Sequence, residues 1–127
     1  MKIGNLSKES GVSRDTVRLY EKLGLLKGIS RPYEFNNYKD YDERNVKRIR
    51  MIKQLQGMGI TLRECKEILE AIDNGEFDEK SGKEFIQSRI AKIDTKIREL
   101  EKTKAILLEE FTQCKAEDIE EIKLKKL

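Results

Sequence analysis

Apolar residues recur at helical spacing along most of the chain, and the breaks between periodic segments predict where helices begin and end. The first segment begins at Ile3 and should end at Gly11, because glycine suits the left-handed turn that follows a helix. Ser13 can cap a second segment, which runs to about Gly24. Two helices joined by a short turn that contains glycine are typical of a helix-turn-helix unit.

Residues 27–41 show a different pattern, in which turn-forming residues alternate with β-prone aromatic ones. This pattern predicts an irregular hairpin, and Asn36 and Asn37 suit its tip because asparagine tolerates a positive φ. A hairpin that directly follows a helix-turn-helix would form a wing beside it.

Two further helices are predicted after the wing. Asp42 can cap a helix over about 43–57, which the glycines that follow should end. Thr61 and Glu64 have the spacing of a capping box and begin a fourth helix, whose apolar positions recur every three or four residues. A polar segment at 74–82 then forms a linker.

The longest periodic segment follows this linker. Ser81 and Glu84 could form another capping box, and the apolar positions then advance by four and three residues in turn. Such heptad spacing predicts a coiled-coil helix over 83–116, ~50 Å long, whose partner is most simply a second copy of the chain. The polar Lys104 interrupts the seam, and the apolar residues predicted to form the dimer contact are Ile86, Ile90, Ile93, Ile97, Leu100, Leu107 and Phe111.

The distribution of charge suggests what the N-terminal half binds. Charged residues make up 40% of the chain and apolar residues 37%, so a large globular core is not expected. Residues 1–63 hold 14 Lys and Arg against seven Asp and Glu, whereas residues 64–127 have a net charge of −4. We therefore predict a mainly α chain with a winged helix-turn-helix DNA-binding domain at 1–73 and a tail or short helix at 117–127.

Several function classes are disfavoured by the composition. The chain has no histidine, so the most common general base and metal ligand is missing, and we expect no enzyme. Cys65 and Cys114 lie far apart, which indicates neither a disulfide framework nor a zinc module. No apolar run approaches the roughly 20 residues of a membrane span, and no signal peptide is visible. We expect a cytoplasmic protein without a membrane partner.

Taken together, these segments resemble the MerR family of bacterial transcription regulators. The resemblance rests on "IGNLSKESGVSRDTVRLYEKLGLL" at 3–26, "NNYKDY" at 36–41, "RIRMIKQLQGMGITLRECKEIL" at 48–69 and the long helix that follows. The family's wing motif has glycine and arginine where this chain has Asn37 and Lys39. Lysine keeps the charge that a phosphate needs but lacks the planar fork of arginine.

The resemblance implies a function and a mechanism. It implies a homodimer, joined by an antiparallel coiled coil, that binds an inverted repeat in a promoter. It also implies that the dimer bends and untwists the DNA, so that RNA polymerase can engage both promoter elements, which would place the protein on the bacterial nucleoid. Two alternatives stay open: an architectural or chromosome-anchoring DNA-binding protein, and a protein-interaction adaptor whose basic half only confers solubility.

The predicted DNA contacts fall on the second helix, the wing and the fourth helix. The first turn of the second helix of a helix-turn-helix faces base edges, which selects Arg14, Thr16 and Arg18, although a solvated charged face is the alternative. Tyr20 could place its hydroxyl at a phosphate or simply pack in the core. The predicted backbone contacts are those of Arg31, Tyr38, Lys39, Tyr41 and Arg63, with core packing as an alternative for Tyr41 and a solvated position for Arg63.

The two cysteines are the remaining candidates for chemistry. Cys65 shares a helix face with apolar residues, so we expect a buried, inert thiol. Cys114 falls on the seam, where it could be structural or a sensor thiol. Metal-sensing members of the resembling family carry more cysteines than this segment offers, so we expect no cofactor. A thiol-based metal or redox site would require Cys114 to meet a cysteine of the other subunit.

Overall fold

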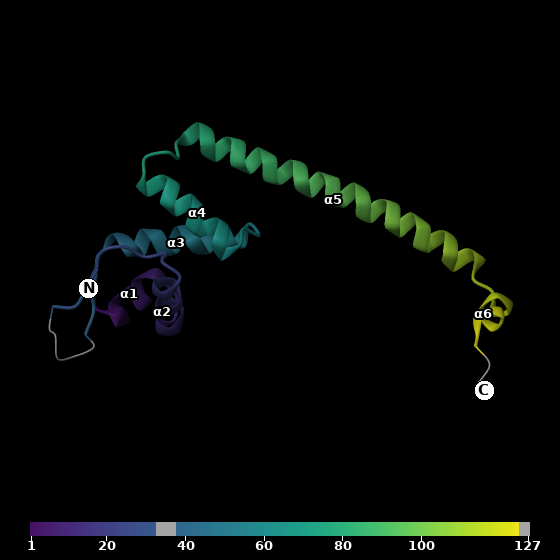
Figure 1. Ribbon diagram of the computed structural model, residues 1–127, viewed down its shortest axis with the longest axis horizontal. Coiled ribbons are helices and arrows are strands. Elements are labelled where there is room, and N and C mark those ends of the chain that lie inside the picture. Colours follow the sequence, from purple (N-terminus) through teal and green to yellow (C-terminus); the bar gives the residue numbers. More distant parts are fainter. Residues whose placement is uncertain (33–37, 125–127) are drawn as a thin grey trace. The chain divides into compact units, whose positions relative to one another are not determined.

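The computed structural model describes residues 1–32 and 38–124 and contains six helices and two short strands within those ranges. The chain divides into two compact units, Met1–Asp78 and Glu79–Leu127. The first unit holds four helices and the strand pair, and the second holds one long helix and one short one (Figure 1). The predicted mainly α architecture, with a winged helix-turn-helix before a long helix, is confirmed.

The helix-turn-helix forms as its caps predict. Helix α1 spans Ile3–Ser10 and is followed by Gly11, whose φ of 76° lies in the left-handed region that glycine adopts without a Cβ clash. Helix α2 spans Arg14–Lys22, and the Ser13 hydroxyl accepts a hydrogen bond from the Thr16 N–H at 3.1 Å. The turn between the helices is therefore held by a glycine on one side and a serine cap on the other.

The wing is a short antiparallel ladder. Strand β1 is Ile29–Ser30 and strand β2 is Asp40–Tyr41, with Ile29 opposite Tyr41 and Ser30 opposite Asp40. The Tyr41 N–H also donates to the Met1 carbonyl at 2.7 Å, which ties β2 to the residues that precede α1. The predicted tip at 36–37 lies outside the described residues.

Two helices complete the first unit. Helix α3 spans Arg44–Gly57, and the Asp42 carboxylate accepts from the Arg44 N–H at 2.8 Å. Helix α4 spans Leu62–Asp73 and begins with a complete capping box between Thr61 and Glu64, as the sequence predicts.

The core of the first unit lies where the apolar faces of its four helices meet, as their helical spacing predicts. Each fully buried Leu or Ile contributes about 1.5–3 kcal/mol relative to an exposed position. The residues less than 2% exposed are Leu6, Val17, Leu25, Asn45, Ile49, Ile52 and Cys65.

Two polar side chains of α3 fix the chain between α2 and the wing. Asn45 is fully buried, and its amide oxygen accepts from the Lys27 N–H at 3.0 Å while its amide nitrogen donates to the Lys27 carbonyl at 2.7 Å. Arg48 donates from Nε to the Leu25 carbonyl at 3.0 Å and from Nη1 to Asp73 Oδ1 at 2.8 Å. The end of α2, the start of the wing and the end of α4 are thereby joined through one helix.

The second unit consists of α5, Glu79–Gln113, and α6, Ala116–Ile122. The predicted start at 83 and the predicted cap at Ser81 are wrong, because α5 begins four residues earlier. Glu79 occupies the first turn, where the helix dipole favours a negative charge. Its Oε1 forms an ion pair with Lys83 Nζ at 3.0 Å. The predicted end at 116 is also wrong, because Lys115 has an extended backbone and Cys114 lies one residue past the helix.

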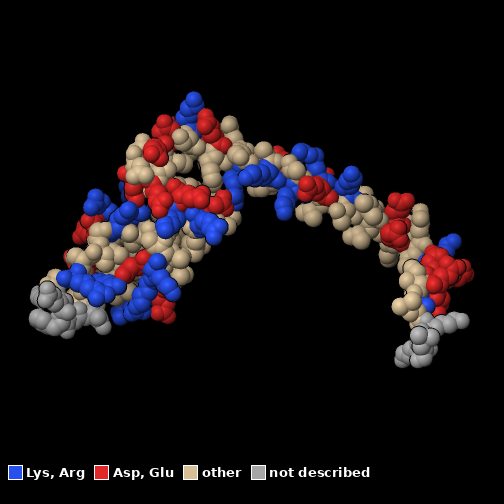
Figure 2. Space-filling view, viewed as in Figure 1, with Lys and Arg blue, Asp and Glu red and all other residues tan. Residues whose placement is uncertain are grey.

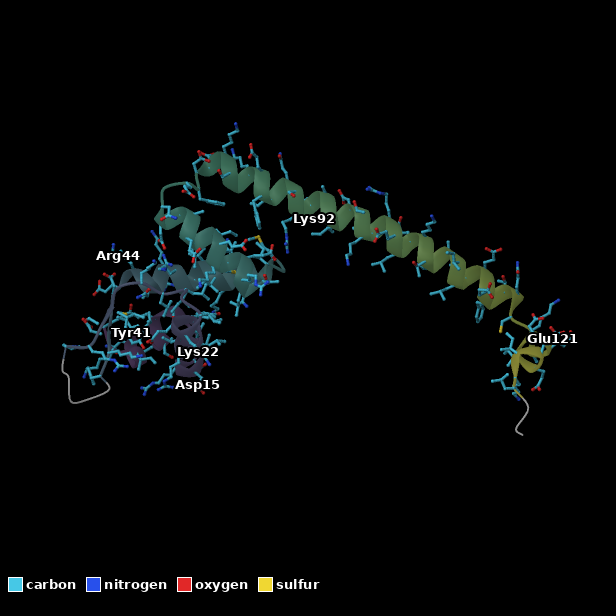
Figure 3. All side chains as sticks on the ribbon, in the orientation of Figure 1. Asp15, Lys22, Tyr41, Arg44, Lys92 and Glu121 are labelled. Carbon is cyan, nitrogen blue, oxygen red and sulfur yellow. The ribbon has the colours of Figure 1, made fainter. Side chains whose placement is uncertain are left out.

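The apolar seam predicted on α5 is uncovered in the protomer. No residue of α5 is buried, and its side chains project outward along its length (Figure 3). The seven predicted dimer residues have exposed fractions of 46–82%, namely Ile86, Ile90, Ile93, Ile97, Leu100, Leu107 and Phe111.

Within residues 1–32 and 38–124, no helix has the length and apolar character that a membrane crossing needs.

Candidate nucleic-acid interface

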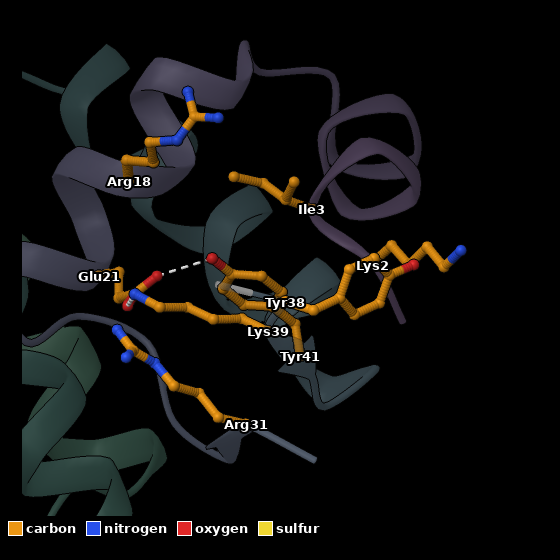
Figure 4. Close-up of a pocket in the computed structure, with 8 residues that line it drawn as sticks. All are labelled: Lys2, Ile3, Arg18, Glu21, Arg31, Tyr38, Lys39 and Tyr41. Carbon is orange, nitrogen blue, oxygen red and sulfur yellow. Dashed lines mark hydrogen bonds and ion pairs between the residues drawn. The ribbon is translucent and has the colours of Figure 1, made fainter. Parts of the chain in front are cut away.

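A cavity of about 480 Å³ opens between α2 and the wing (Figure 4). Four of the side chains that line it are cationic, and one, Glu21, is anionic. Lys and Arg side chains gather on the same part of the first unit in the space-filling view, next to the wing (Figure 2). The complete lining is Lys2, Ile3, Arg18, Glu21, Arg31, Tyr38, Lys39 and Tyr41.

The three candidates on the first turns of α2 have different surroundings. The Arg14 guanidinium lies against α1, where a Cβ at Gly4 would come within 2.8 Å of it. The Thr16 hydroxyl is 2.9 Å from the Ser13 hydroxyl, so part of its hydrogen-bonding capacity serves the helix cap. Arg18 is 59% exposed and donates to Asp15 at 2.9 Å. Of the three, only Arg18 lines the basic cavity.

Two of the three candidate tyrosines, Tyr20 and Tyr41, lie in the core. Tyr20 is 4% exposed and donates its hydroxyl hydrogen to Gln56 Oε1 at 3.0 Å, and burial raises its pKa. Tyr41 is 2% exposed and donates to Glu21 Oε1 at 2.7 Å; burial and this hydrogen bond raise its pKa. Each hydroxyl has one proton, and it donates that proton in a hydrogen bond to a side chain of the same unit. The geometry therefore favours core packing over a phosphate contact for Tyr20 and Tyr41.

Besides the buried Tyr41, the wing candidates that line the cavity are Arg31, Tyr38 and Lys39. Lys39 forms an ion pair with Glu21, and the ammonium of Lys2 lies over the Tyr38 ring, 4.8 Å from its centre. Lys2 is a cavity residue that the sequence analysis missed, because nothing in a local pattern places the start of the chain beside a residue 36 positions later.

Arg63 lies apart from this cavity. It occupies the first turn of α4 and lines a smaller hollow of about 290 Å³ with Leu23, Leu62 and Lys66. Its position in the first turn of a helix is the one that the sequence predicts for a phosphate contact.

Glu21 is the second residue that sequence reasoning missed. It lies in the last turn of α2, with its side chain 20% exposed, and its two carboxylate oxygens contact Lys39 and the Tyr41 hydroxyl. Burial opposes its ionisation, but hydrogen bonds from Lys39 and Tyr41 and the charges of Lys39 and Arg31 outweigh burial and lower its pKa. An anion is thereby held stably within a basic cavity.

The two thiols lie in different units and differ in exposure. Cys65 is buried in the core of the first unit, and burial, with a smaller contribution from Glu64, raises the pKa of its thiol. Cys114 is exposed in the second unit. Among the described residues of a single chain, no three side chains of the Cys, Asp or Glu type come together as a metal site.

Comparison with known proteins identifies the family. The family described as "MerR HTH family regulatory protein" matches residues 1–72, and the one described as "MerR, DNA binding" matches residues 46–109. The chain belongs to the MerR family. It is therefore a DNA-binding transcription regulator, of a family whose members act as dimers on promoter DNA.

Individual MerR relatives cover nearly the whole chain. The HTH-type transcriptional regulator HmrR of Rhizobium leguminosarum bv. viciae is 30% identical over 93% of this chain and 89% of its own length. The mercuric resistance operon regulatory protein of Bacillus cereus is 31% identical over 89% of this chain and 84% of its own. The crystal structure of the regulator PbrR691 from Ralstonia metallidurans CH34 with lead(II) matches with a TM-score of 0.74 and 29% identity, covering 91% of this chain and 88% of that one.

Proposed function

We propose that this MerR regulator binds an inverted repeat in a promoter through α2 and the wing of each subunit. The observation that carries the proposal is the basic cavity between these two elements, because Arg18 of α2 and Arg31 and Lys39 of the wing line the same hollow. In this arrangement Arg18 would enter the major groove while the wing cations contact the sugar-phosphate backbone.

The second subunit would be recruited through α5. The seven seam residues are 46–82% exposed in a protomer, and a second copy of the same helix offers a complementary apolar stripe along the same length. Dimerisation would place two copies of α2 at a fixed separation, which is the geometry that an inverted repeat requires. The dimer would control transcription by distorting the DNA between the promoter elements, in a two-state equilibrium that a signal biases.

Selection of bound duplexes from random sequence, using the full-length protein, tests this proposal. We expect one inverted repeat to be enriched, with a fixed half-site spacing. Arg18→Ala should lower affinity for that operator about 5- to 150-fold, the range expected for loss of one specific base contact. Arg98→Ala removes an exposed arginine from α5 and should leave the affinity unchanged. Enrichment of no common sequence would favour the architectural alternative, and full affinity in Arg18→Ala would refute the proposed interface.

A soft-metal response is the second candidate, favoured by the relatives named for mercuric resistance and the lead(II)-bound structure. Cys114 is the exposed thiol of this chain, but a single thiolate does not make a tight site, so the partner subunit would have to supply another. Titration of the dimer with Hg²⁺ or Pb²⁺ should then produce a thiolate-to-metal charge-transfer band that Cys114→Ser abolishes. A band that survives Cys114→Ser, or no band, would reject this candidate.

A further inference from the structure

The cavity between α2 and the wing contains a carboxylate, and electrostatic attraction of DNA does not explain its presence there. Glu21 projects into a hollow whose other charged lining residues are Lys2, Arg18, Arg31 and Lys39 (Figure 4). A negative charge beside a phosphate backbone weakens binding, because it repels the polyanion and neutralises a cation that could contact it. The position of Glu21 therefore calls for a role other than attraction.

The contacts of Glu21 cross from α2 to the wing. Its Oε1 accepts from the Tyr41 hydroxyl at 2.7 Å, and its Oε2 pairs with the Lys39 ammonium. Tyr41 belongs to β2 and Lys39 immediately precedes that strand, so one side chain of α2 holds two wing residues, one within β2 and one just before it.

The wing depends on such contacts because its own ladder is short. It consists of two residue pairs, Ile29 with Tyr41 and Ser30 with Asp40. An isolated two-stranded hairpin is marginally stable at best, even when it is longer than this. The orientation of the wing is thus set by what it packs against, and the buried Tyr41 ring and the Glu21 carboxylate supply a contact to α2.

We propose that Glu21 is a positioning residue for DNA recognition. Its carboxylate fixes the wing to α2, so that the cations of the wing and of α2 contact the DNA in a fixed position relative to each other. This inference rests on the proposed interface. The Lys39 ammonium has three protons, so it can pair with Glu21 and still donate to a phosphate. Glu21 would then lower affinity for DNA in general and raise discrimination for the operator.

The test compares two affinities of the full-length protein, one for the selected operator and one for a scrambled duplex of equal length. Glu21→Gln keeps the shape of the side chain and removes its charge. We expect operator affinity to fall about tenfold while scrambled-duplex affinity is unchanged or up to about threefold tighter, because one repulsive charge is lost. Amide exchange at Ser30 and Tyr41 should also be faster in the free variant. Glu9→Gln, which removes an equal charge from an exposed site on α1, should leave the ratio of the two affinities unchanged.

A carboxylate that only stabilised the fold would lower the melting temperature without changing this ratio in the folded protein. A ratio within twofold of wild type in Glu21→Gln therefore overturns the proposal. If Glu21→Gln fails to fold, Tyr41→Phe serves as the second variant, because it keeps the buried ring and removes the hydroxyl that donates to Glu21. A ratio of operator to scrambled-duplex affinity that is lowered about threefold in Tyr41→Phe supports the proposal, and an unchanged ratio overturns it. Loss of operator binding in Arg18→Ala with an unchanged ratio in Glu21→Gln would reject the role of Glu21 and leave the interface standing.

Discussion

Asn45→Asp changes one atom of a fully buried side chain and tests how the wing is attached to α3. In the wild type, the Asn45 amide nitrogen donates to the Lys27 carbonyl at 2.7 Å and its oxygen accepts from the Lys27 N–H at 3.0 Å. Aspartate keeps the acceptor but replaces the donor by an oxygen, which faces the carbonyl oxygen. The loss of one hydrogen bond costs about 1 kcal/mol, and the unsatisfied carbonyl and the buried charge add about 1–3 kcal/mol. We expect a destabilisation of about 2–4 kcal/mol at neutral pH.

The loss of stability in Asn45→Asp should depend on pH, and the burial and contacts of residue 45 set its direction. Burial and the facing carbonyl raise the pKa of the new carboxyl in the folded state, and its protonated form can donate to Lys27 again. A raised folded pKa means that the variant is most stable below the ordinary carboxyl pKa of about 4 and loses stability as the pH rises through the folded value. The difference from wild type should therefore be smaller at acid pH than at neutral pH.

Urea unfolding at a fixed protein concentration, at acid and neutral pH, measures both effects, since the stability of a dimer depends on concentration. Asn5→Asp makes the same chemical change at an exposed position of α1 and should stay within about 0.5 kcal/mol of wild type. A loss below about 1 kcal/mol for Asn45→Asp at neutral pH, or an equal loss at both pH values, would refute the assigned hydrogen bonds.

Four further outcomes follow from the fold. Thr61→Ala removes the cap that accepts from the Glu64 N–H and should cost about 1 kcal/mol by thermal unfolding; no loss would mean that the cap is dispensable. Ile97→Lys places a charge on the α5 seam, so sedimentation should detect monomers, and an intact dimer would argue for another interface. Because the pKa of Glu21 is lowered, its stabilising contribution is present above pH ~4 and is lost as the pH falls further, so wild type and Glu21→Gln should converge in acid. Because the pKa of Tyr41 is raised, wild type should lose stability relative to Tyr41→Phe above pH ~10, and parallel pH profiles would contradict this.

Signals within one turn of a helix were sufficient to predict where α1 ends and where α2 and α4 begin. The left-handed Gly11, the Ser13 cap and the Thr61 capping box each act on backbone groups three or four residues away, so the sequence alone contains both partners. The same reasoning was wrong for α5, where Ser81 looked like a cap but lies inside a helix that the charge of Glu79 favours from an earlier start.

Contacts between distant segments could not be predicted in this way. Glu21 and Tyr41 are 20 positions apart in the sequence, and Tyr20 and Gln56 are 36 positions apart. No local periodicity relates the members of either pair. The sequence therefore identified the wing cations but not the carboxylate that holds them. It also left the roles of the Tyr20 and Tyr41 hydroxyls open, because their partners depend on the tertiary packing.

The double contact of Arg48 with Leu25 and Asp73 bears on how regulators of this kind can be recombined. Asp73 is the last residue of α4, so every partner of Arg48 lies before the short connection at 74–78. A chimera joined before Asp73 would deprive the guanidinium of its carboxylate and loosen the exit of α2. A junction within 74–78 keeps the first unit whole, which makes this connection the natural site for exchanging the second unit for that of another regulator.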